Sequence, residues 1–261
     1  KEARWLAENG VTELVVVAQD TTRYGEDIYG KSMLPELLTA LCEIDGFKWI
    51  RTLYCYPERI TDELLDVIAK EDKLVKYLDM PIQHCDKTIL KRMNRHGDRE
   101  TLTALIKKIR EKIPNVALRT TLITGFPGET EEQFEELCEF VKEIRFERLG
   151  CFAYSPEEGT PAEKFEDQVP LKDRERRAEI IMEEQMIISD SLNEAALDSE
   201  VEVVCEGFDR YAECYYGRSQ ADAPEIDGKI FFLSEDKVRV GEYVKVKIDD
   251  TMDYDLIGSK M

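Results

Sequence analysis

The chain has 261 residues, of which 43% are hydrophobic and 35% are charged, which is the composition of a globular protein. No apolar run approaches the roughly 20 residues needed to cross a bilayer, and no signal peptide precedes the first helical pattern, so we expect a cytoplasmic protein without a membrane partner. The formal net charge of −20 disfavours broad contact with nucleic acid, because such a surface repels phosphates. It favours a basic protein partner, although acidity that merely maintains solubility is an equally good explanation of the charge alone.

Apolar segments alternate with helical patterns up to about Leu197. Five segments rich in Val, Ile, Leu and Tyr lack strict alternation, which is typical of strands buried on both faces. These predicted strands are Glu13–Gln19, Trp49–Tyr56, Val75–Ile82, Ala117–Ile123 and Arg148–Tyr154. The predicted helices between them are Leu34–Ile44, Asp62–Lys70, Thr88–Met93, Arg99–Lys112 and Glu131–Ile144.

This alternation of strands and helices indicates a parallel sheet with right-handed crossovers. Five strands are too few for a closed eight-stranded barrel, so we predict an α/β fold built on a partial parallel barrel that lacks its first strand. The active site of such a barrel lies at the carboxyl ends of the strands.

A long helical pattern covers about Leu171 to Leu197, and the pattern then changes. Short segments with β-branched and aromatic residues follow, separated by Gly, Asp and Pro. They are Val201–Cys205, Ala212–Ser219, Gly228–Leu233 and Tyr243–Ile248. We therefore predict that residues 1–198 form the partial barrel with its long helix and that residues 199–261 form a small antiparallel β-barrel.

The seven cysteines are scattered along the chain, and none lies in a C-x-x-C pair or another spacing typical of a metal site. An odd number of scattered cysteines is typical of reduced thiols in a cytosolic protein. We predict no metal-binding residue in this chain.

The most informative segment is the turn Gly125–Thr130, with the sequence GFPGET, between the fourth strand and the next helix. Two glycines and a proline make a tight turn that lets a ligand approach the backbone. Phosphate loops and purely structural turns share this pattern, so the turn alone leaves both interpretations open. Polar residues also follow the other strands, for example at Gln19, Gln83 and Tyr154, and their recurrence favours a cofactor site.

Taken together, these segments resemble the radical S-adenosylmethionine (SAM) superfamily and, within it, the methylthiotransferases. The resemblance covers essentially the whole chain. It rests on GFPGET at Gly125, the strand end at Gln19, the P-x-Q segment at Pro81 and the YSPEEGTPA segment at Tyr154. The residues from about Ser199 resemble a TRAM domain. The resemblance implies a radical SAM partial barrel followed by a TRAM β-barrel.

Methylthiotransferases of this group modify either tRNA or, in the RimO type, an aspartate of small-subunit ribosomal protein number twelve. Four segments resemble the RimO type more closely: Gln19–Thr22, Pro81–His84, Arg119–Thr121 and Ala221–Gly228. From Glu200 to Met261 there are fifteen acidic and eight basic residues, a net charge of −7. Such a module repels RNA and suits a basic ribosomal protein. A tRNA methylthiotransferase and a non-catalytic binding fragment remain alternatives.

The resemblance also implies [4Fe–4S] clusters, which are held by cysteine thiolates. The family's C-x-x-x-C-x-x-C loop and its cysteine-bearing N-terminal domain are absent from this sequence, and Lys1 stands where the loop would just have ended. We therefore expect an enzyme fragment that lacks the cluster ligands and is inactive by itself.

For the cofactor SAM, the resemblance implies contacts from nine residues: Gln19 and Asp20 at the amino group, Gln83 and His84 at the ribose or carboxylate, Arg119 at a carboxylate, Ile123, Gly125 and Phe126 around the adenine, and Glu129. The candidate substrate-binding residues are Tyr154, Glu157, Glu158, Asp222, Glu225 and Asp227.

Each of these assignments has a structural alternative. Arg119 can form a salt bridge within the protein, His84 can cap the helix that follows it, and Glu129 suits the first turn of a helix because of the helix dipole. The sequence predicts no catalytic residue.

Overall fold

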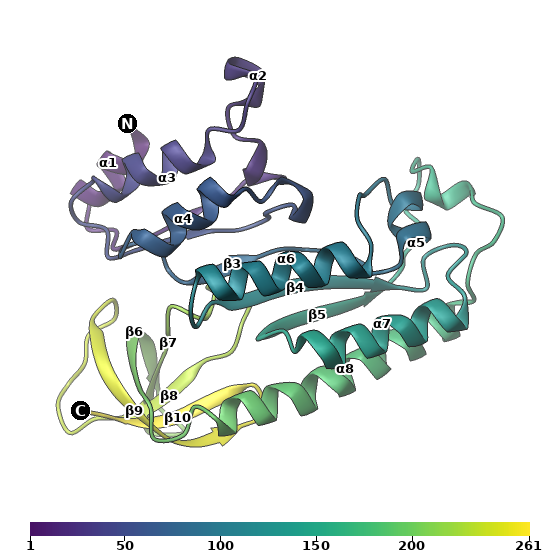
Figure 1. Ribbon diagram of the computed structural model, residues 1–261. Helices are drawn as coiled ribbons and strands as arrows, with labels where there is room; N and C mark the ends of the chain where they lie inside the picture. The colour runs from purple at the N-terminus through teal and green to yellow at the C-terminus, as the bar shows by residue number, and fades with distance from the viewer.

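The computed structural model describes all 261 residues and contains a larger α/β part, a small β-barrel and a long helix between them (Figure 1). The strands of the α/β part are β1 (Glu13–Val16), β2 (Trp49–Thr52), β3 (Tyr77–Asp79), β4 (Ala117–Thr124) and β5 (Arg148–Ala153). Its helices are α1 (Glu2–Glu8), α2 (Glu26–Tyr29), α3 (Leu34–Cys42), α4 (Asp62–Lys70), α5 (Lys87–Arg92), α6 (Arg99–Lys112) and α7 (Glu131–Ile144). The connecting helix is α8 (Leu171–Glu194).

All five strands run parallel, as the sequence predicts. They pair as β1-β2 and as β3-β4-β5, and a single bridge between Ile50 and Leu74 connects the two groups. The first three strands end earlier than predicted. Tyr54 adopts a left-handed backbone, with φ of 58°, and this conformation cannot continue β2. Beyond Asp79 the chain pairs with β4 again only at an isolated bridge between Gln83 and Leu122.

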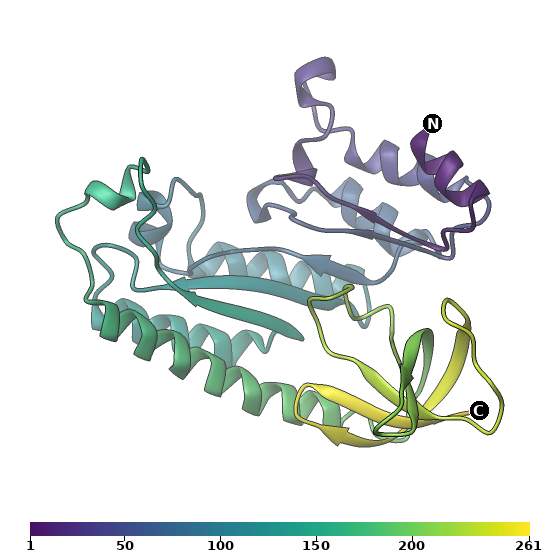
Figure 2. The ribbon, with the colours of Figure 1, turned by 180° about the vertical axis from the view of Figure 1, so that it is seen from behind.

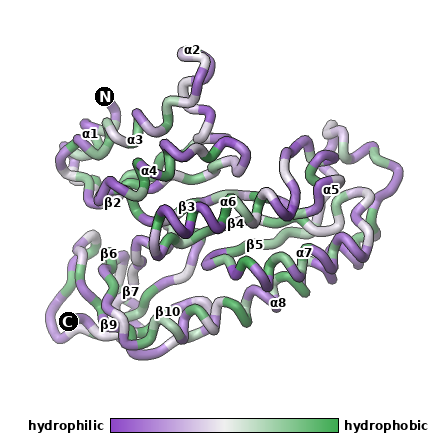
Figure 3. Tube along the Cα trace, viewed as in Figure 1, coloured by the Kyte–Doolittle hydropathy of each residue, from purple (hydrophilic) through white to green (hydrophobic).

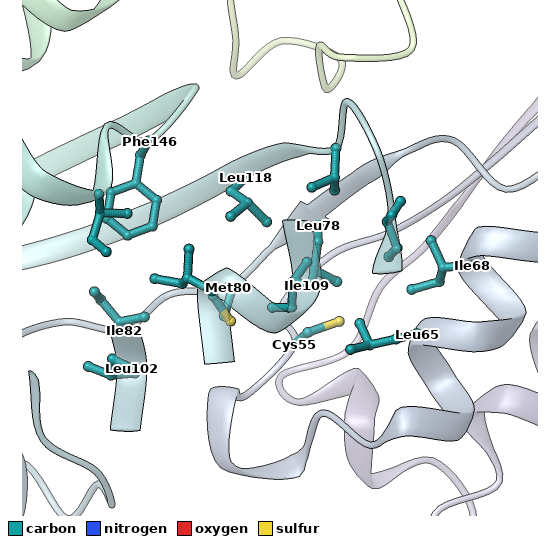
Figure 4. Packing of buried hydrophobic residues seen from close by; sticks show 14 of the residues in the cluster. Cys55, Leu65, Ile68, Leu78, Met80, Ile82, Leu102, Ile109, Leu118 and Phe146 are labelled. Atoms are coloured by element: carbon teal, nitrogen blue, oxygen red, sulfur yellow. The ribbon is translucent and has the colours of Figure 1, made fainter. Parts of the chain in front are cut away.

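The main core lies between the sheet and the helices and contains 32 buried residues. Side chains alternate along β4: Leu118 and Leu122 face the core, whereas Arg119, Thr121 and Ile123 are less buried and face the other way. Figure 4 shows Leu118 packed in the core with Leu78, a neighbour on the adjacent strand. The tubes of α6, α7 and α8 in Figure 3 alternate between hydrophilic and hydrophobic stretches, as expected for helices with one buried face. The opposite face of the sheet, which we call the inner face, carries the polar side chains.

The C-terminal residues form a closed five-stranded barrel with the order β10-β8-β7-β6-β9. Its strands are β6 (Glu200–Asp209), β7 (Cys214–Arg218), β8 (Ile230–Leu233), β9 (Tyr243–Met252) and β10 (Asp255–Lys260). Four strands were predicted and β10 was missed, because its sequence, DLIGSK, is too polar to stand out as a strand. The pairing of β10 with β8 is parallel, so the barrel is not purely antiparallel.

The small barrel packs against the inner face at the amino ends of the strands, which we call the base. A cluster of seven buried residues joins Trp49, Tyr77 and Ala117 of the sheet to Val204 and Ala223 of the barrel. The carboxyl ends of the strands, which we call the mouth, lie at the opposite end of the sheet from the barrel (Figure 2). None of the helices combines the length and apolarity needed to cross a bilayer.

Candidate cofactor and substrate site

The glycine turn at the mouth is held in place by a side chain from its own loop. Gly125 and Gly128 both have positive φ angles, of 69° and 83°, and the backbone N–H of Gly125 donates a hydrogen bond to Glu129 Oε2 at 2.9 Å. Thr130 then starts α7 with the predicted capping box to Gln133. The strand, turn and capped helix therefore follow the sequence prediction.

The reason for the two glycines differs from the one predicted. A Cβ atom on Gly125 would lie 2.3 Å from Cγ of Arg174, and one on Gly128 would lie 2.6 Å from Oδ2 of Asp167. Side chains of the protein itself, from α8 and the loop before it, fill the space next to both glycines. The small residues therefore allow α8 to pack closely against the turn, rather than allowing a ligand to approach it.

Two buried arginines of α8 connect this helix to the mouth. Arg177 forms a buried ion pair with Glu129, with 2.7 Å between Nη1 and Oε1. Arg174 donates a hydrogen bond from Nη1 to the backbone oxygen of Tyr154 at 3.0 Å, just beyond the end of β5. Because a buried charge without its partner is strongly unfavourable, these contacts fix the position of the turn relative to α8.

His84 and Glu129 are both fully buried, so direct contact of either with a cofactor is not supported. His84 Nδ1 accepts a hydrogen bond from the backbone N–H of Asp86 at 2.9 Å, which places its proton on Nε2. That atom lies 3.5 Å from Glu129 Oε2. The cap of α5 is Asp86, whose side chain accepts from the backbone N–H groups of Thr88 and Ile89, so His84 supports the cap residue without capping the helix itself, and Glu129 acts as a brace inside the turn.

A cavity of ≈ 420 Å³ opens at the mouth between β3, β4, α5 and the loop before α8. Three of the predicted cofactor residues line it: Gln83, Ile123 and Phe126. The other lining residues are Arg92, Met93, Asn94, Arg95, Thr160, Pro161, Ala162 and Phe165. Gln83 Oε1 and Arg92 Nε are buried there without a hydrogen-bond partner. The lining thus includes two side chains with a buried polar atom that has no partner in the protein, one an acceptor and one a donor, beside apolar side chains.

The sequence analysis missed Arg92 and Arg95 as residues of this cavity. Arg92 pairs with Asp167 at 2.6 Å, and Arg95 donates to the backbone oxygen of Pro81 at 3.0 Å. The sequence offered one signal for them, a run of basic residues that begins soon after Gln83 and His84 in an otherwise acidic chain. Such a run is usually a solvated helix face, and only the fold shows that it borders a cavity.

Gln19 and Asp20 lie after β1 and do not line this cavity. Gln19 is exposed and makes no side-chain hydrogen bond. Asp20 caps a short 3-10 helix by accepting from the backbone N–H of Thr22 at 3.1 Å, and it lies 3.6 Å from Nε of Arg59. The structure gives Asp20 a structural role and leaves Gln19 available.

Arg119, Asp222 and Asp227 lie at the base, where they fasten the small barrel to the sheet. Arg119 Nη1 pairs with Asp79 at 2.8 Å, and Arg119 Nε lies 3.5 Å from Asp227. Tyr77 donates its hydroxyl to Asp227 at 2.7 Å. Burial raises the pKa of Asp227, and it also raises that of Tyr77. Arg119 and Asp227 are thus engaged with other side chains of the protein, and the predictions that Arg119 binds the cofactor and that Asp227 binds substrate stay predictions.

Asp222 is buried in the same interface. It accepts from Nε of Arg148 at 3.1 Å and from the hydroxyl of Ser219 at 2.7 Å. Tyr154, another predicted substrate residue, is 8% exposed and packs edge-on against Phe126, with 5.1 Å between ring centroids. Both side chains are buried, so their exposure does not favour contact with substrate, and the two assignments stay predictions.

The remaining predicted substrate residues, Glu157, Glu158 and Glu225, are exposed, and none forms an ion pair. They are accessible to a partner, and their role stays a prediction.

The cysteines do not form a cluster. No group of three or more His, Cys, Asp or Glu side chains is placed to hold a metal ion. Burial raises the pKa of Cys85 and Cys151 to about 12 and that of Cys55 to about 11. The thiolate form that ligates an iron–sulfur cluster is therefore disfavoured at these positions.

Comparison with known proteins identifies the family to which the chain belongs. The radical SAM superfamily matches residues 1–141, and the TRAM domain matches residues 199–260. The chain is 51% identical over 259 residues to the ribosomal protein uS12 methylthiotransferase RimO of Lachnoclostridium phytofermentans, and the match covers 99% of the chain and 59% of that protein. It is 49% identical over 258 residues to the RimO of Clostridium tetani, covering 99% of the chain and 58% of that protein. The chain thus spans less than two thirds of the length of these relatives.

Among solved structures, coproporphyrinogen III oxidase from Escherichia coli, a radical SAM enzyme, superposes with a TM-score of 0.47 at 18% identity. The superposition covers 71% of the chain and 50% of the oxidase. Together with the parallel partial barrel and the closed five-stranded barrel, the family matches show that the chain belongs to the radical SAM superfamily and carries a TRAM domain.

Proposed function

We propose that this chain is the SAM-binding and TRAM-bearing part of a methylthiotransferase that modifies an aspartate of ribosomal protein uS12. The near-50% identity to proteins named as uS12 methylthiotransferases supports the reaction and the substrate. The acidic TRAM barrel supports a protein substrate, because a protein that packs against ribosomal RNA carries basic segments. A ribosomal substrate also fits a cytoplasmic enzyme.

The observation that carries the cofactor assignment is the pair of unpaired polar atoms in the mouth cavity. Gln83 Oε1 can accept a hydrogen bond and Arg92 Nε can donate one. The edge of an adenine ring presents both an amino donor and a ring-nitrogen acceptor. The apolar side chains of Ile123 and Phe126 border the same space and can contact the face of the ring. The residues present therefore fit the adenine part of SAM.

In this arrangement the residues of the cavity bind SAM and orient it. The Glu129–Arg177 pair keeps the glycine turn and Phe126 in place. When bound together with a [4Fe–4S] cluster, SAM supplies radical chemistry in this superfamily. The dispersed cysteines of this chain, five of which are buried, do not fit such a cluster, and we propose that its ligands lie outside these residues.

We also propose two domains, residues 1–198 and 199–261. Asp198 has a left-handed backbone, with φ of 63°, and stands between the end of α8 and the start of β6. The side chains of the barrel form a core of their own with eight buried residues. These features support a boundary at this position.

The test is equilibrium binding of purified uS12 and of unmodified tRNA to the chain at physiological salt. We expect uS12 to bind more tightly, since the TRAM residues have a net charge of −7. Tighter binding of tRNA would support a tRNA methylthiotransferase instead. Binding of SAM without binding of either macromolecule would favour a fragment that recognises only the nucleotide, and it would contradict the proposed substrate.

A further inference from the structure

A second cavity lies on the inner face between the edge strand β5, the helix α8 and the TRAM barrel. It has a volume of ≈ 620 Å³ and is distinct from the mouth cavity, with which it shares no lining residue. Its walls come from Leu149, Gly150 and Phe152 of β5, from Glu225–Gly228, from Tyr254 and from Met182 of α8. Figures 1 and 2 both show β5, α8 and the barrel side by side at this place. We call this cavity the β5 groove.

Three large apolar side chains of the groove are left exposed. Phe152 is 62% exposed, Ile226 is 48% exposed and Tyr254 is 41% exposed. Single exposed apolar residues are common, but three around one concave site mark a surface where another molecule packs. The three come from different parts of the chain, so the fold itself creates this patch.

The charged side chains of the groove that have no ion-pair partner are acidic. Its two arginines, Arg119 and Arg148, are already bound to carboxylates of the base. Glu225 and Asp255 line the groove and form no ion pair. Burial raises the pKa of Tyr254, and the neighbouring carboxylates of Asp190 and Asp253 raise it further. A molecule that enters the groove therefore meets net negative charge.

The groove leads toward the cofactor cavity. Phe152 of β5 pairs in register with Ile123 of β4, so the two residues are cross-strand neighbours on the inner face. Phe152 lines the groove and Ile123 lines the mouth cavity. A chain that follows β5 through the groove thus arrives beside the site where SAM is proposed to bind.

We propose that the β5 groove docks an extended, basic segment of the protein substrate and directs it past Phe152 to the cofactor cavity. The inference rests on the proposed function and adds the surface by which the substrate is held. β5 is the edge strand of its sheet, which suits a partner segment in extended conformation alongside it. The unpaired carboxylates select a basic partner and disfavour RNA.

The test compares the affinity of labelled, purified uS12 for the wild-type chain and two surface variants. Glu225→Lys reverses an unpaired charge of the groove, and Phe152→Ser removes its largest exposed apolar side chain. We expect each to weaken uS12 binding about tenfold, because each removes a contact from the centre of the docking surface. The matched control is Glu43→Lys, an exposed and unpaired acid at the end of α3 on the helical side, which should change the affinity less than twofold.

Both groove variants alter exposed side chains, so thermal melts and SAM affinity should match the wild type. The proposal is overturned if wild-type chain binds uS12 and both groove variants bind it equally well; the proposed function then still stands. If the wild type does not bind uS12, or if it binds tRNA and the same two substitutions weaken that tRNA binding, the proposed function fails and the docking proposal fails with it.

Discussion

Most polar side chains at the base of the inner face have partners within the protein, although Arg51 Nη2 is buried without one, whereas unpaired polar atoms at the mouth belong to side chains that line a cavity. At the base, Glu13 accepts hydrogen bonds from both Arg51 and Arg218, and Asp227 accepts from Tyr77. At the mouth, Gln83 Oε1 and Arg92 Nε are buried with no partner. Buried polar groups in folded proteins are normally satisfied, so an unsatisfied pair beside a cavity indicates a place for a ligand. The base is therefore a structural joint and the mouth a binding site, although the sequence places polar residues at both.

The largest of the predicted effects is expected at the base, where a substitution tests whether this region is structural. Replacing Asp227 by Ala leaves the buried hydroxyl of Tyr77 without its acceptor and removes one of the two carboxylates beside Arg119, which keeps its ion pair with Asp79. We expect the free energy of unfolding to fall by about 3 kcal/mol, measured by urea denaturation, with SAM affinity unchanged within twofold.

Two further variants sharpen this prediction. Asp227→Asn keeps an oxygen that can accept from Tyr77 and should lose less stability. Glu225→Ala, an exposed neighbour, should change stability by less than about 0.5 kcal/mol. Loss of SAM affinity with intact stability in Asp227→Ala would show that the base takes part in cofactor binding.

A smaller effect is expected at the glycine turn. Gly125→Ala places a Cβ atom against Arg174 at a position with φ of 69°, so both strain and overpacking oppose it. We expect a loss of about 2 kcal/mol in the free energy of unfolding. The matched control is Gly159→Ala, which has φ of 83° but no atom within 4 Å of the added Cβ, and it should lose only about 1 kcal/mol. Equal losses in the two variants would contradict the packing role that the structure gives to Arg174.

Much of the fold follows from local sequence. The buried strands, the helix patterns between them and the Thr130–Gln133 capping box are all readable from neighbouring residues. The exact strand ends are not, and at β2 the reason is the left-handed conformation of Tyr54, a residue type that gives no local signal for it. The polar strand β10 was missed for a similar reason, since closure of the barrel rather than its own sequence makes it a strand.

The site was predicted less completely than the fold. Ile123 lies near the end of β4, Phe126 and Gln83 lie shortly beyond β4 and β3, and their place at the mouth comes from the topology. The partners of Asp222 and Asp227 are Arg148 and Arg119, far away in the sequence, so only the folded chain shows that these carboxylates are internal. Charge at a strand end identifies a candidate residue, and its partners decide whether it is free to bind.

Titration calorimetry with SAM tests the central claim most directly, using wild type, Gln83→Ala and Asp227→Ala. We expect the wild type to bind SAM and Gln83→Ala to bind it about five- to tenfold more weakly, with unchanged urea denaturation, because the removed acceptor has no partner within the protein. Asp227→Ala should show the reverse, with lower stability and normal SAM affinity. Equal SAM affinity of Gln83→Ala and the wild type would contradict the assignment of the mouth cavity to the cofactor.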